Sequence, residues 1–386
     1  MANVWLTQHL DARYGNTLRE ILLTNLSYGT RILMDPDGWE RLAPFQTPSE
    51  LPDDPWLQRA HQAHVLVGET AAQPPDFILR LEASLKNELE KIEGKRPDTP
   101  TNSAGLLELL ARIEEVFQQR WMPRAFTGDP LQAGHLMHEP HRLVNFMFDH
   151  TRAFLQYDLE NDNQTVDLGL LRQLFERPAL KLRYEQQFCI PRTTQSRAQR
   201  MIAALKPGAR VLVLGDDDLV SLALLHQGGD FEVDVLELDE DLVAYLQAKG
   251  GDRLTVLQHN LRHGVPDSMK GAYDLVTTDP PYAAKGMRFF LECAVASMAP
   301  GPDTRLFLTT FPGLIEKPDQ LFADLEELGL NILKTQEHFS RYIYNNSYRV
   351  QHVAALRHLG SPLHPTAELL GFPYLYAHFF ECAHLA

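Results

Sequence analysis

Residues 211–241 constrain the fold more than any other part of this chain. An apolar run ends at Gly215, a helical segment follows, and a second apolar run ends at Glu237. Strand, tight turn, helix and strand in this order form the first unit of a parallel sheet. The turn after the first strand is where such sheets bind nucleotides. We therefore expect a ligand site beside Gly215.

That turn carries carboxylates where a nucleotide-binding turn carries glycines. Asp216, Asp217 and Asp218 follow the glycine, and residues 211–241 hold ten Asp or Glu and no Lys or Arg. The first turn of a helix favours one or two acidic residues, but three adjacent carboxylates repel one another. A site with this charge repels phosphate, so it suits a cofactor without phosphate and a positively charged substrate.

The sequence after this unit keeps alternating between apolar runs and helical segments. The predicted strands are residues 210–214, 233–238, 254–258, 273–278 and 305–310, and the predicted helices are residues 219–227, 242–249, 285–298 and 318–328. Such alternation predicts a parallel sheet covered on both faces. Two further strand-like runs, 332–342 and 348–356, flank an asparagine pair that favours a tight turn, and they predict a terminal antiparallel hairpin.

The spacing of apolar side chains predicts that the first 179 residues are a mainly helical N-terminal region. Apolar side chains recur at helical spacing in residues 17–26, 76–91, 104–121, 141–157 and 168–176. Repeated prolines between these segments predict an irregular stretch, and residues 180–188 predict a strand. We divide the chain into this region (1–179), a catalytic domain (180–359) and a tail (360–386). We expect the first region to recognise substrate or to mediate oligomerisation.

Composition limits the classes of partner. The chain has 386 residues, of which 44% are apolar, and a formal net charge of −15. Duplex binding needs Lys and Arg to neutralise phosphates, so nucleic acid is not expected as the main partner. The charge is compatible with a polycationic substrate, although many cytosolic proteins are acidic for solubility alone.

The chain is expected to be cytoplasmic and free of membrane contact. Cys189, Cys293 and Cys382 lie far apart and fit no metal motif, which indicates free thiols in a reducing compartment. The first residues lack the apolar core of a signal peptide, and no apolar run approaches the ~20 residues that span a bilayer.

A run of histidines, His135, His138 and His141 with His150 beyond, suggests a metal site at first sight. Pro140 breaks the helix that would align them, and no Cys or Asp pair completes a ligand set. We therefore predict no metal.

Two further motifs follow predicted strands in the order that this fold requires. Glu237 lies about twenty residues after the first turn, where a carboxylate accepts hydrogen bonds from ribose hydroxyls. Asp279, Pro280, Pro281 and Tyr282 follow the fourth strand. The prolines stiffen the backbone so that the Pro280 carbonyl can accept from an amine, Tyr282 offers a flat face, and Asp279 can take a proton. The structural alternative for Glu237 is a solvated acidic turn, and the alternative for Asp279 to Tyr282 is a plain proline turn.

The tetrapeptide DPPY resembles the motif of S-adenosylmethionine (AdoMet) dependent amino methyltransferases, which place a target amine against that carbonyl. The combination of GDDDLVS, VLELDEDL, HNLRHGVP and TDPPY is more narrowly similar to the branched-chain polyamine synthase family, N4-bis(aminopropyl)spermidine synthase. The resemblance covers about residues 180–353, including Tyr184, Glu185 and Gln186. The sequence departs from the family at Asn260, where an acidic residue is usual, and in its long N-terminal region.

This resemblance implies a class I AdoMet-transferase fold of the α/β class. Its Rossmann-like sheet is mostly parallel and ends in an antiparallel hairpin. The resemblance also implies an enzyme that transfers an aminopropyl group from decarboxylated AdoMet to an amine, such as the polyamine spermidine. Decarboxylated AdoMet carries an ammonium and a sulfonium but no carboxylate, so the acidic loop favours it over AdoMet. The implied reaction is an in-line displacement at the methylene next to sulfur.

Roles for individual residues follow from the resemblance together with the charge argument. The residues expected to act in catalysis are Asp216, Asp279 and Tyr282. The residues expected to bind the cofactor are Gln187, Gly215, Asp217, Asp218, Glu237 and Asn260. The residues expected to bind the acceptor are Asp216, Asp218, Pro280, Pro281 and Tyr282. We also expect a homodimer.

Two rival functions share the fold. One is an AdoMet-dependent N-methyltransferase that acts on a nucleic acid base or a protein amide, although the acidic charge argues against it. The other is a transferase that acts on a peptide or natural-product amine, with the N-terminal region as its recognition domain. The mass of the transferred group distinguishes the methyl from the aminopropyl donor.

Overall fold

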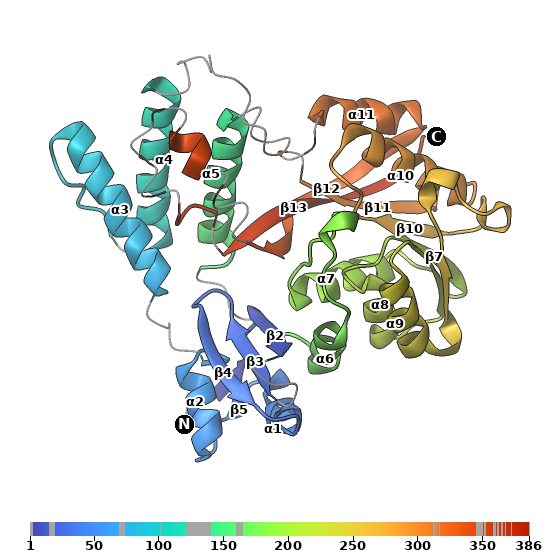
Figure 1. Cartoon of the computed structure of the whole chain (residues 1–386), viewed down its shortest axis with the longest axis horizontal. Coiled ribbons are helices and arrows are strands. Elements are labelled where there is room, and N and C mark those ends of the chain that lie inside the picture. The colour runs from blue at the N-terminus through green and yellow to red at the C-terminus, as the bar shows by residue number, and fades with distance from the viewer. Residues whose placement is uncertain are drawn as a thin grey trace. The chain divides into compact units, whose positions relative to one another are not determined.

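The computed structural model in Figure 1 describes residues 3–14, 20–68, 74–100, 102–120, 140–159, 165–311, 313, 315, 317–344, 350, 353–357, 360, 363, 366, 368–371 and 373–385. The chain forms two compact units. The first comprises Met1–Leu10, Tyr14–Thr165 and Ile343–Leu375, and the second comprises Asp11–Arg13, Val166–Tyr342 and Tyr376–Ala386.

Within the described residues, the second unit is built on a seven-stranded sheet with the order β12-β13-β11-β10-β7-β8-β9. The strands are β7 (Ala209–Leu214), β8 (Phe231–Glu237), β9 (Leu254–Gln258), β10 (Leu275–Thr278), β11 (Arg305–Thr310), β12 (Leu330–Ile343) and β13 (Tyr374–His384). Strands β7 to β11 pair in parallel, whereas β13 runs antiparallel to β11. A parallel sheet that ends in an antiparallel element is the class I AdoMet-transferase arrangement, so the predicted fold class is confirmed.

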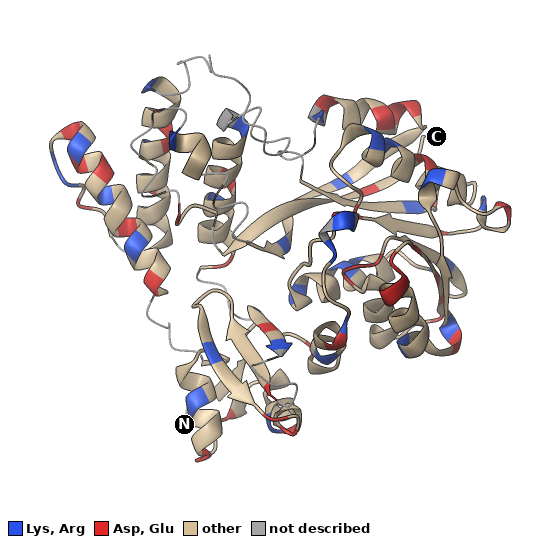
Figure 2. Ribbon diagram, viewed as in Figure 1, with Lys and Arg blue, Asp and Glu red and all other residues tan. Residues whose placement is uncertain are grey.

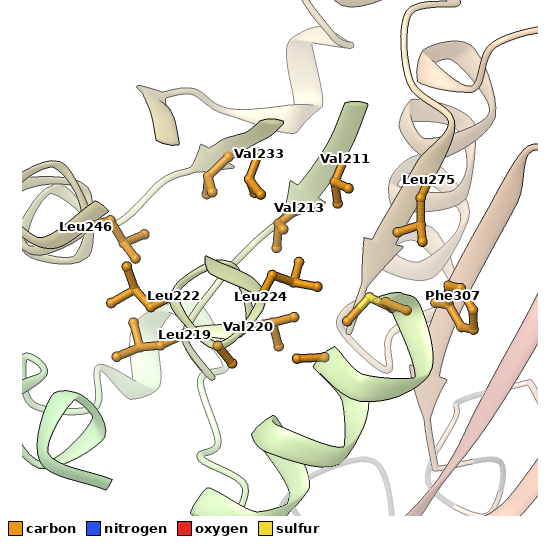
Figure 3. Packing of buried hydrophobic residues seen from close by; sticks show 14 of the residues in the cluster. Val211, Val213, Leu219, Val220, Leu222, Leu224, Val233, Leu246, Leu275 and Phe307 are labelled. Atoms are coloured by element: carbon orange, nitrogen blue, oxygen red, sulfur yellow. The ribbon is translucent and has the colours of Figure 1, made fainter. Parts of the chain in front are cut away.

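Helices cover both faces of this sheet because its central strands are apolar on both sides. Val211 and Val213 belong to one buried cluster, which includes residues of α6 (Leu168–Glu176), α7 (Pro191–Ile202), α8 (Val220–Gln227) and α9 (Glu240–Gly250), as Figure 3 shows. Leu212 and Leu214 belong to a second cluster with α10 (Ala284–Ser297) and α11 (Pro318–Glu327). Alternate residues of a strand point to opposite faces, so a strand buried on both faces appears as a continuous apolar run.

The predicted helices and parallel strands of this unit all appear close to their expected bounds, but the strand predicted at residues 180–188 is wrong. That segment holds a short 3-10 turn, Leu182–Tyr184, and Glu185 follows it with a φ of 58°. A residue in the left-handed region turns the chain and ends any extended run. The turn forms part of the site described below.

The terminal hairpin was predicted with the wrong second strand. Residues 353–357 are helical, and the asparagine pair lies outside the described residues. The strand next to β12 is β13, which lies between β12 and β11 in a stretch that was set apart as a tail. Most of β13 is buried, and its largely apolar sequence, interrupted by His378 and Glu381, has no regular alternation. The division of the chain into domains at residues 1–179, 180–359 and 360–386 stays a prediction.

The first unit mixes strands and helices. Its elements include β1 (Asn3–Leu6), β3 (Ile21–Asn25), β4 (Thr30–Met34), α1 (Gly38–Leu42), β5 (Ser49–Glu50), α2 (Pro55–Gln62), β6 (Leu66–Gly68), α3 (Asp76–Glu93), α4 (Ser103–Arg120) and α5 (Pro140–Tyr157). The helix predicted at residues 17–26 is wrong, because β3 alternates between buried and half-buried side chains and pairs with β4. A remaining strand, β2 (Leu10–Tyr14), belongs to a three-stranded sheet of order β2-β3-β4. Across the described parts of the chain, no helix combines the length and apolar character needed to cross a bilayer.

Candidate active site

A cavity of about 360 Å³ lies at the carboxyl ends of the central strands of the second unit. This is the position where open α/β sheets bind ligands, and the volume suits a small-molecule ligand. The predicted site residues that line the cavity are Gln187, Gly215, Asp216, Asp217, Glu237, Asn260, Asp279, Pro280, Pro281 and Tyr282. Asp218 instead lines a second cavity of about 20 Å³ in the described part of the chain.

Gly215 and Glu237 form the turn where β7 and β8 end. Gly215 has a φ of 72°, which side-chain-bearing residues rarely adopt, so a glycine is needed for this turn. Glu237 accepts hydrogen bonds from the backbone N–H groups of Asp216 (2.8 Å), Leu238 (2.7 Å) and Asp239 (2.8 Å). Burial raises the pKa of Glu237, and these hydrogen bonds oppose the rise. A carboxylate has about four acceptor positions, so Glu237 can still accept from a ligand hydroxyl.

The Asp216 carboxylate caps the first turn of α8. It accepts hydrogen bonds from the backbone N–H of Val220 at 2.6 Å and from the backbone N–H and hydroxyl of Ser221. The side chain is 1% exposed, and burial raises its pKa to about 8 against the opposing effect of Ser221. This geometry favours a structural function for Asp216, and its function in catalysis stays a prediction.

We expect Asp216→Ala to lower the melting temperature, because replacing a capping carboxylate costs about 1 kcal/mol and leaves helix donors buried. Thermal denaturation should be compared with that of Asp230→Ala, which removes an exposed carboxylate from a loop of the same unit. An unchanged melting temperature together with lost turnover would support catalysis by Asp216 instead.

Asp218 is paired inside the protein. Its carboxylate accepts from the backbone N–H of Cys189 at 2.7 Å and from Nη1 of Arg197 at 2.8 Å. Both partners of the ion pair are almost completely buried. The geometry therefore gives Asp218 a structural partner of its own, and its predicted contact with a ligand ammonium stays a prediction.

Asp217 is the member of the acidic trio whose carboxylate is neither capping α8 nor paired with Arg197. Its Oδ2 accepts from the backbone N–H of Gln187 at 3.2 Å, and among the described residues its side chain has no ion-pair partner within 4.0 Å. Burial raises the pKa of Asp217 well above its usual range, and the nearby carboxylates of Asp218 and Asp279 raise it further. A bound cation would relieve this repulsion, so the cavity favours a positively charged ligand group here.

Asp279 lines the cavity from the loop after β10. Its Oδ2 accepts hydrogen bonds from Nη2 of Arg197 at 3.3 Å and from the hydroxyl of Tyr342. Burial raises the pKa of Asp279 to about 6, and Arg197 opposes the rise. A carboxyl with this pKa can accept a proton near neutral pH.

The aromatic side of the cavity comes from the loop after β10, from α10 and from β12. The ring of Tyr282 meets Phe311 edge-on, with ring centroids 5.6 Å apart, and Phe311 lies 4.9 Å from Tyr342. Phe289 and Phe290 of α10 also line the cavity. Such faces can hold the apolar part of a nucleoside or an aliphatic chain.

Sequence reasoning missed Arg197 and Tyr342 as site residues. Arg197 lies on α7, and it is 3% exposed because acidic loops from other strands surround it. Nothing in the local sequence shows such a long-range contact. Tyr342 ends a predicted strand, and a tyrosine at a strand end beside the ligand edge was the available signal.

Polar and acidic residues also follow β8 and β9. Asn260 accepts from the backbone N–H of Arg262 at 3.1 Å and lines the cavity. Asp239, Glu240 and Asp241 at the start of α9 lie close enough together to hold a cation, and Lys181 Nζ pairs with all of them. Figure 2 shows acidic residues at this helix start. His135 and His138 lie outside the described residues, so the expected absence of a metal at the histidine run stays a prediction.

Comparisons with known proteins point to one family. A family model described as the branched-chain polyamine synthase A C-terminal domain matches residues 171–364. The N(4)-bis(aminopropyl)spermidine synthase of Thermococcus kodakarensis is 27% identical over 195 residues, which are 47% of this chain and 56% of that protein. The enzyme of the same name from Thermus thermophilus is 34% identical over 120 residues, which are 30% of this chain and 35% of that protein. The chain thus covers only about half of these relatives or less.

Among solved structures, the C9 mutein of the branched-chain polyamine synthase from Thermus thermophilus is similar, with a TM-score of 0.47 and 20% identity. The comparison covers 80% of this chain and 90% of that one. That protein was solved with N4-aminopropylspermidine and 5'-methylthioadenosine.

Proposed function

Because the chain belongs to the branched-chain polyamine synthase family, we propose that it is an aminopropyltransferase that uses decarboxylated AdoMet. The acceptor is an amine, and we propose a polyamine such as spermidine. The observation that carries the proposal is the Asp217 carboxylate, which lines the cavity without an ion-pair partner among the described residues. Relatives that bear the name N(4)-bis(aminopropyl)spermidine synthase support it.

The donor would bind at the ends of β7 and β8. Glu237 would accept from the ribose hydroxyls, and Asn260 would lie near the adenine. The aminopropyl ammonium would then reach Asp217, whose pKa is raised by burial and neighbouring carboxylates although Arg177 lowers it. The carboxylate of AdoMet would meet like charge at the same position.

The acceptor would lie beside Asp279 and Tyr282. A protonated amine first gives its proton to Asp279, and the Pro280 carbonyl accepts a hydrogen bond that orients the nitrogen. The nitrogen lone pair then forms a bond to the methylene next to sulfur, while the carbon–sulfur bond breaks. Sulfur leaves as the neutral thioether methylthioadenosine, the product carries the new ammonium, and Asp279 releases its proton to solvent. Alignment of the reacting atoms supplies much of the acceleration.

A donor and acceptor panel tests this proposal. The purified protein is incubated with decarboxylated AdoMet and, in turn, diamines, spermidine, and peptide amines, and methylthioadenosine and new amines are quantified. Methylthioadenosine formation that depends on a polyamine supports the proposal, whereas dependence on a peptide amine would favour the peptide alternative. Methyl transfer from AdoMet without any aminopropyl transfer would favour the N-methyltransferase. The motif at residues Asp279–Tyr282 resembles that of amino methyltransferases as well.

The pH dependence follows from Asp279. It accepts a proton only as the carboxylate, so activity should increase as pH rises through the Asp279 pKa of about 6. We expect kcat/KM for the acceptor to fall on the acidic side of this value. Initial rates measured across the pH range at low acceptor concentration check this, and a flat acidic limb would exclude Asp279 as the base.

We also propose that the protein is cytoplasmic and homodimeric. The buried free thiols of Cys189, Cys293 and Cys382 suit a reducing compartment. Light scattering of the purified chain tests the dimer, and fractionation of cells tests the location.

A further inference from the structure

Arg197 joins the two acidic loops of the site from behind the cavity. Its guanidinium donates from Nη1 to Asp218 at 2.8 Å and from Nη2 to Asp279 at 3.3 Å. It also donates from Nε to the hydroxyl of Ser340 at 3.0 Å and from Nη2 to the hydroxyl of Tyr342. A planar guanidinium has a fixed set of donor directions, so these contacts define the relative position of the loops after β7 and β10.

The same contacts fix one end of the Asp279 carboxylate. The Tyr342 hydroxyl donates to Oδ2, the oxygen that also faces Arg197. Within the described residues, no hydrogen bond is assigned to Oδ1, and Asp279 is part of the cavity wall. Two donors hold Oδ2 in place, and this leaves the second oxygen for a ligand.

The guanidinium of Arg197 also balances the negative charges of Asp218 and Asp279. The charges of Asp218 and Asp279 lie close enough to Asp217 to raise its pKa. Burial raises the pKa of Asp279, whereas Arg197 and the hydrogen bond from Tyr342 both lower it. Removing either contact would therefore make the ionised Asp279 less favourable.

We propose that Arg197 and Tyr342 are positioning residues of this site: they orient the Asp279 carboxylate so that Oδ1 meets the acceptor nitrogen. The proposal rests on the transfer reaction proposed above. Arg197 lies outside the wall of the large cavity and Tyr342 lies in it, and we propose that both act through Asp279, which alone receives the proton.

The second unit contains a matched control outside the cavity wall. The hydroxyl of Tyr273 donates to Asp234 Oδ2 at 2.6 Å, and Arg210 Nη2 donates to the same oxygen at 2.8 Å. Tyr273 is as buried as Tyr342, but this trio does not line the large cavity in the described structure. Tyr273→Phe therefore removes a buried tyrosine–aspartate hydrogen bond without touching Asp279.

The test compares Tyr342→Phe, Arg197→Lys and Tyr273→Phe with the wild-type enzyme over the pH range. We expect Tyr342→Phe to lower kcat about tenfold at neutral pH, as expected for the loss of one charge-assisted hydrogen bond. Its KM for the donor should stay within about twofold, because the aromatic ring in the cavity wall is kept and the proposed donor contacts of Glu237 and Asp217 are unchanged. The acidic limb of its kcat/KM profile should move to higher pH, because the pKa of Asp279 rises when a group that lowers it is removed.

Arg197→Lys should move the limb in the same direction, and Tyr273→Phe should leave both kcat and the limb unchanged. Melting temperatures identify variants that fail to fold, and Tyr342→Phe, which removes a single hydroxyl, keeps the test valid if Arg197→Lys unfolds. A wild-type pH profile in folded Tyr342→Phe, or an equal shift in Tyr273→Phe, would overturn the proposal. The wild-type enzyme could instead use only AdoMet. In that case pH profiles recorded with AdoMet still test whether Arg197 and Tyr342 position Asp279, and only the proposed donor is wrong.

Discussion

We expect Asp279→Asn to lower turnover by roughly 10²- to 10⁴-fold, the range typical of a lost general base. Asparagine has nearly the same shape and can still accept hydrogen bonds from Arg197 and Tyr342 through its amide oxygen. It cannot take a proton from the acceptor amine. Stopped assays of product formation by the folded variant measure the effect.

The matched control is Asp267→Asn, which neutralises an exposed carboxylate in the same unit and should keep full activity. The acidic limb of the pH profile should also disappear in Asp279→Asn, since the group that titrates there is gone. Full turnover by Asp279→Asn with a wild-type pH profile would refute the assignment of the base.

The second large effect concerns the choice of donor. Asp217 lies in the cavity where the amino-acid end of the donor is proposed to bind. At an effective dielectric constant of 20, a unit charge pair at 4 Å contributes about 4 kcal/mol before the costs of desolvation and of ionising Asp217 are subtracted. If a third of this remains, decarboxylated AdoMet binds about tenfold more tightly than AdoMet. We expect Asp217→Asn to remove most of this preference.

Calorimetric titration of both donors at one pH and salt concentration measures this preference. Burial and neighbouring carboxylates raise the pKa of Asp217, and a bound ammonium opposes that rise. Decarboxylated AdoMet should therefore release protons on binding, which appears as a binding enthalpy that depends on the buffer. Asp230→Asn, an exposed loop change, is the control. Equal affinities of the wild-type protein for both donors would contradict the role of Asp217.

The fold of the second unit was predictable because its signals are local and periodic. The apolar runs of β7 and β8 and the helical segment between them specify a strand–helix–strand unit without reference to distant residues. The position of β13 was not predictable in this way. Its place between β11 and β12 depends on pairing over a long sequence separation, and its burial on both faces removes the alternation that marks an exposed strand.

The location of the site was predictable from the acidic turn, but the division of labour within it was not. Asp216, Asp217 and Asp218 are equivalent by composition and spacing. The structure separates them by their neighbours: Asp216 meets the start of α8, Asp218 meets Arg197, and Asp217 lines the cavity without an ion-pair partner among the described residues. These differences arise from backbone geometry at Gly215 and from a helix that lies earlier in the sequence, so they appear only after folding.

One measurement tests the central claim most directly. Wild-type protein receives decarboxylated AdoMet and AdoMet at equal concentration in one reaction with spermidine, and the mass of the modified amine is determined. The proposed function predicts that the amine gains the mass of an aminopropyl group and that methylthioadenosine accumulates in equal amount. An amine that gains only the mass of a methyl group, with AdoMet consumed and decarboxylated AdoMet unchanged, would contradict it.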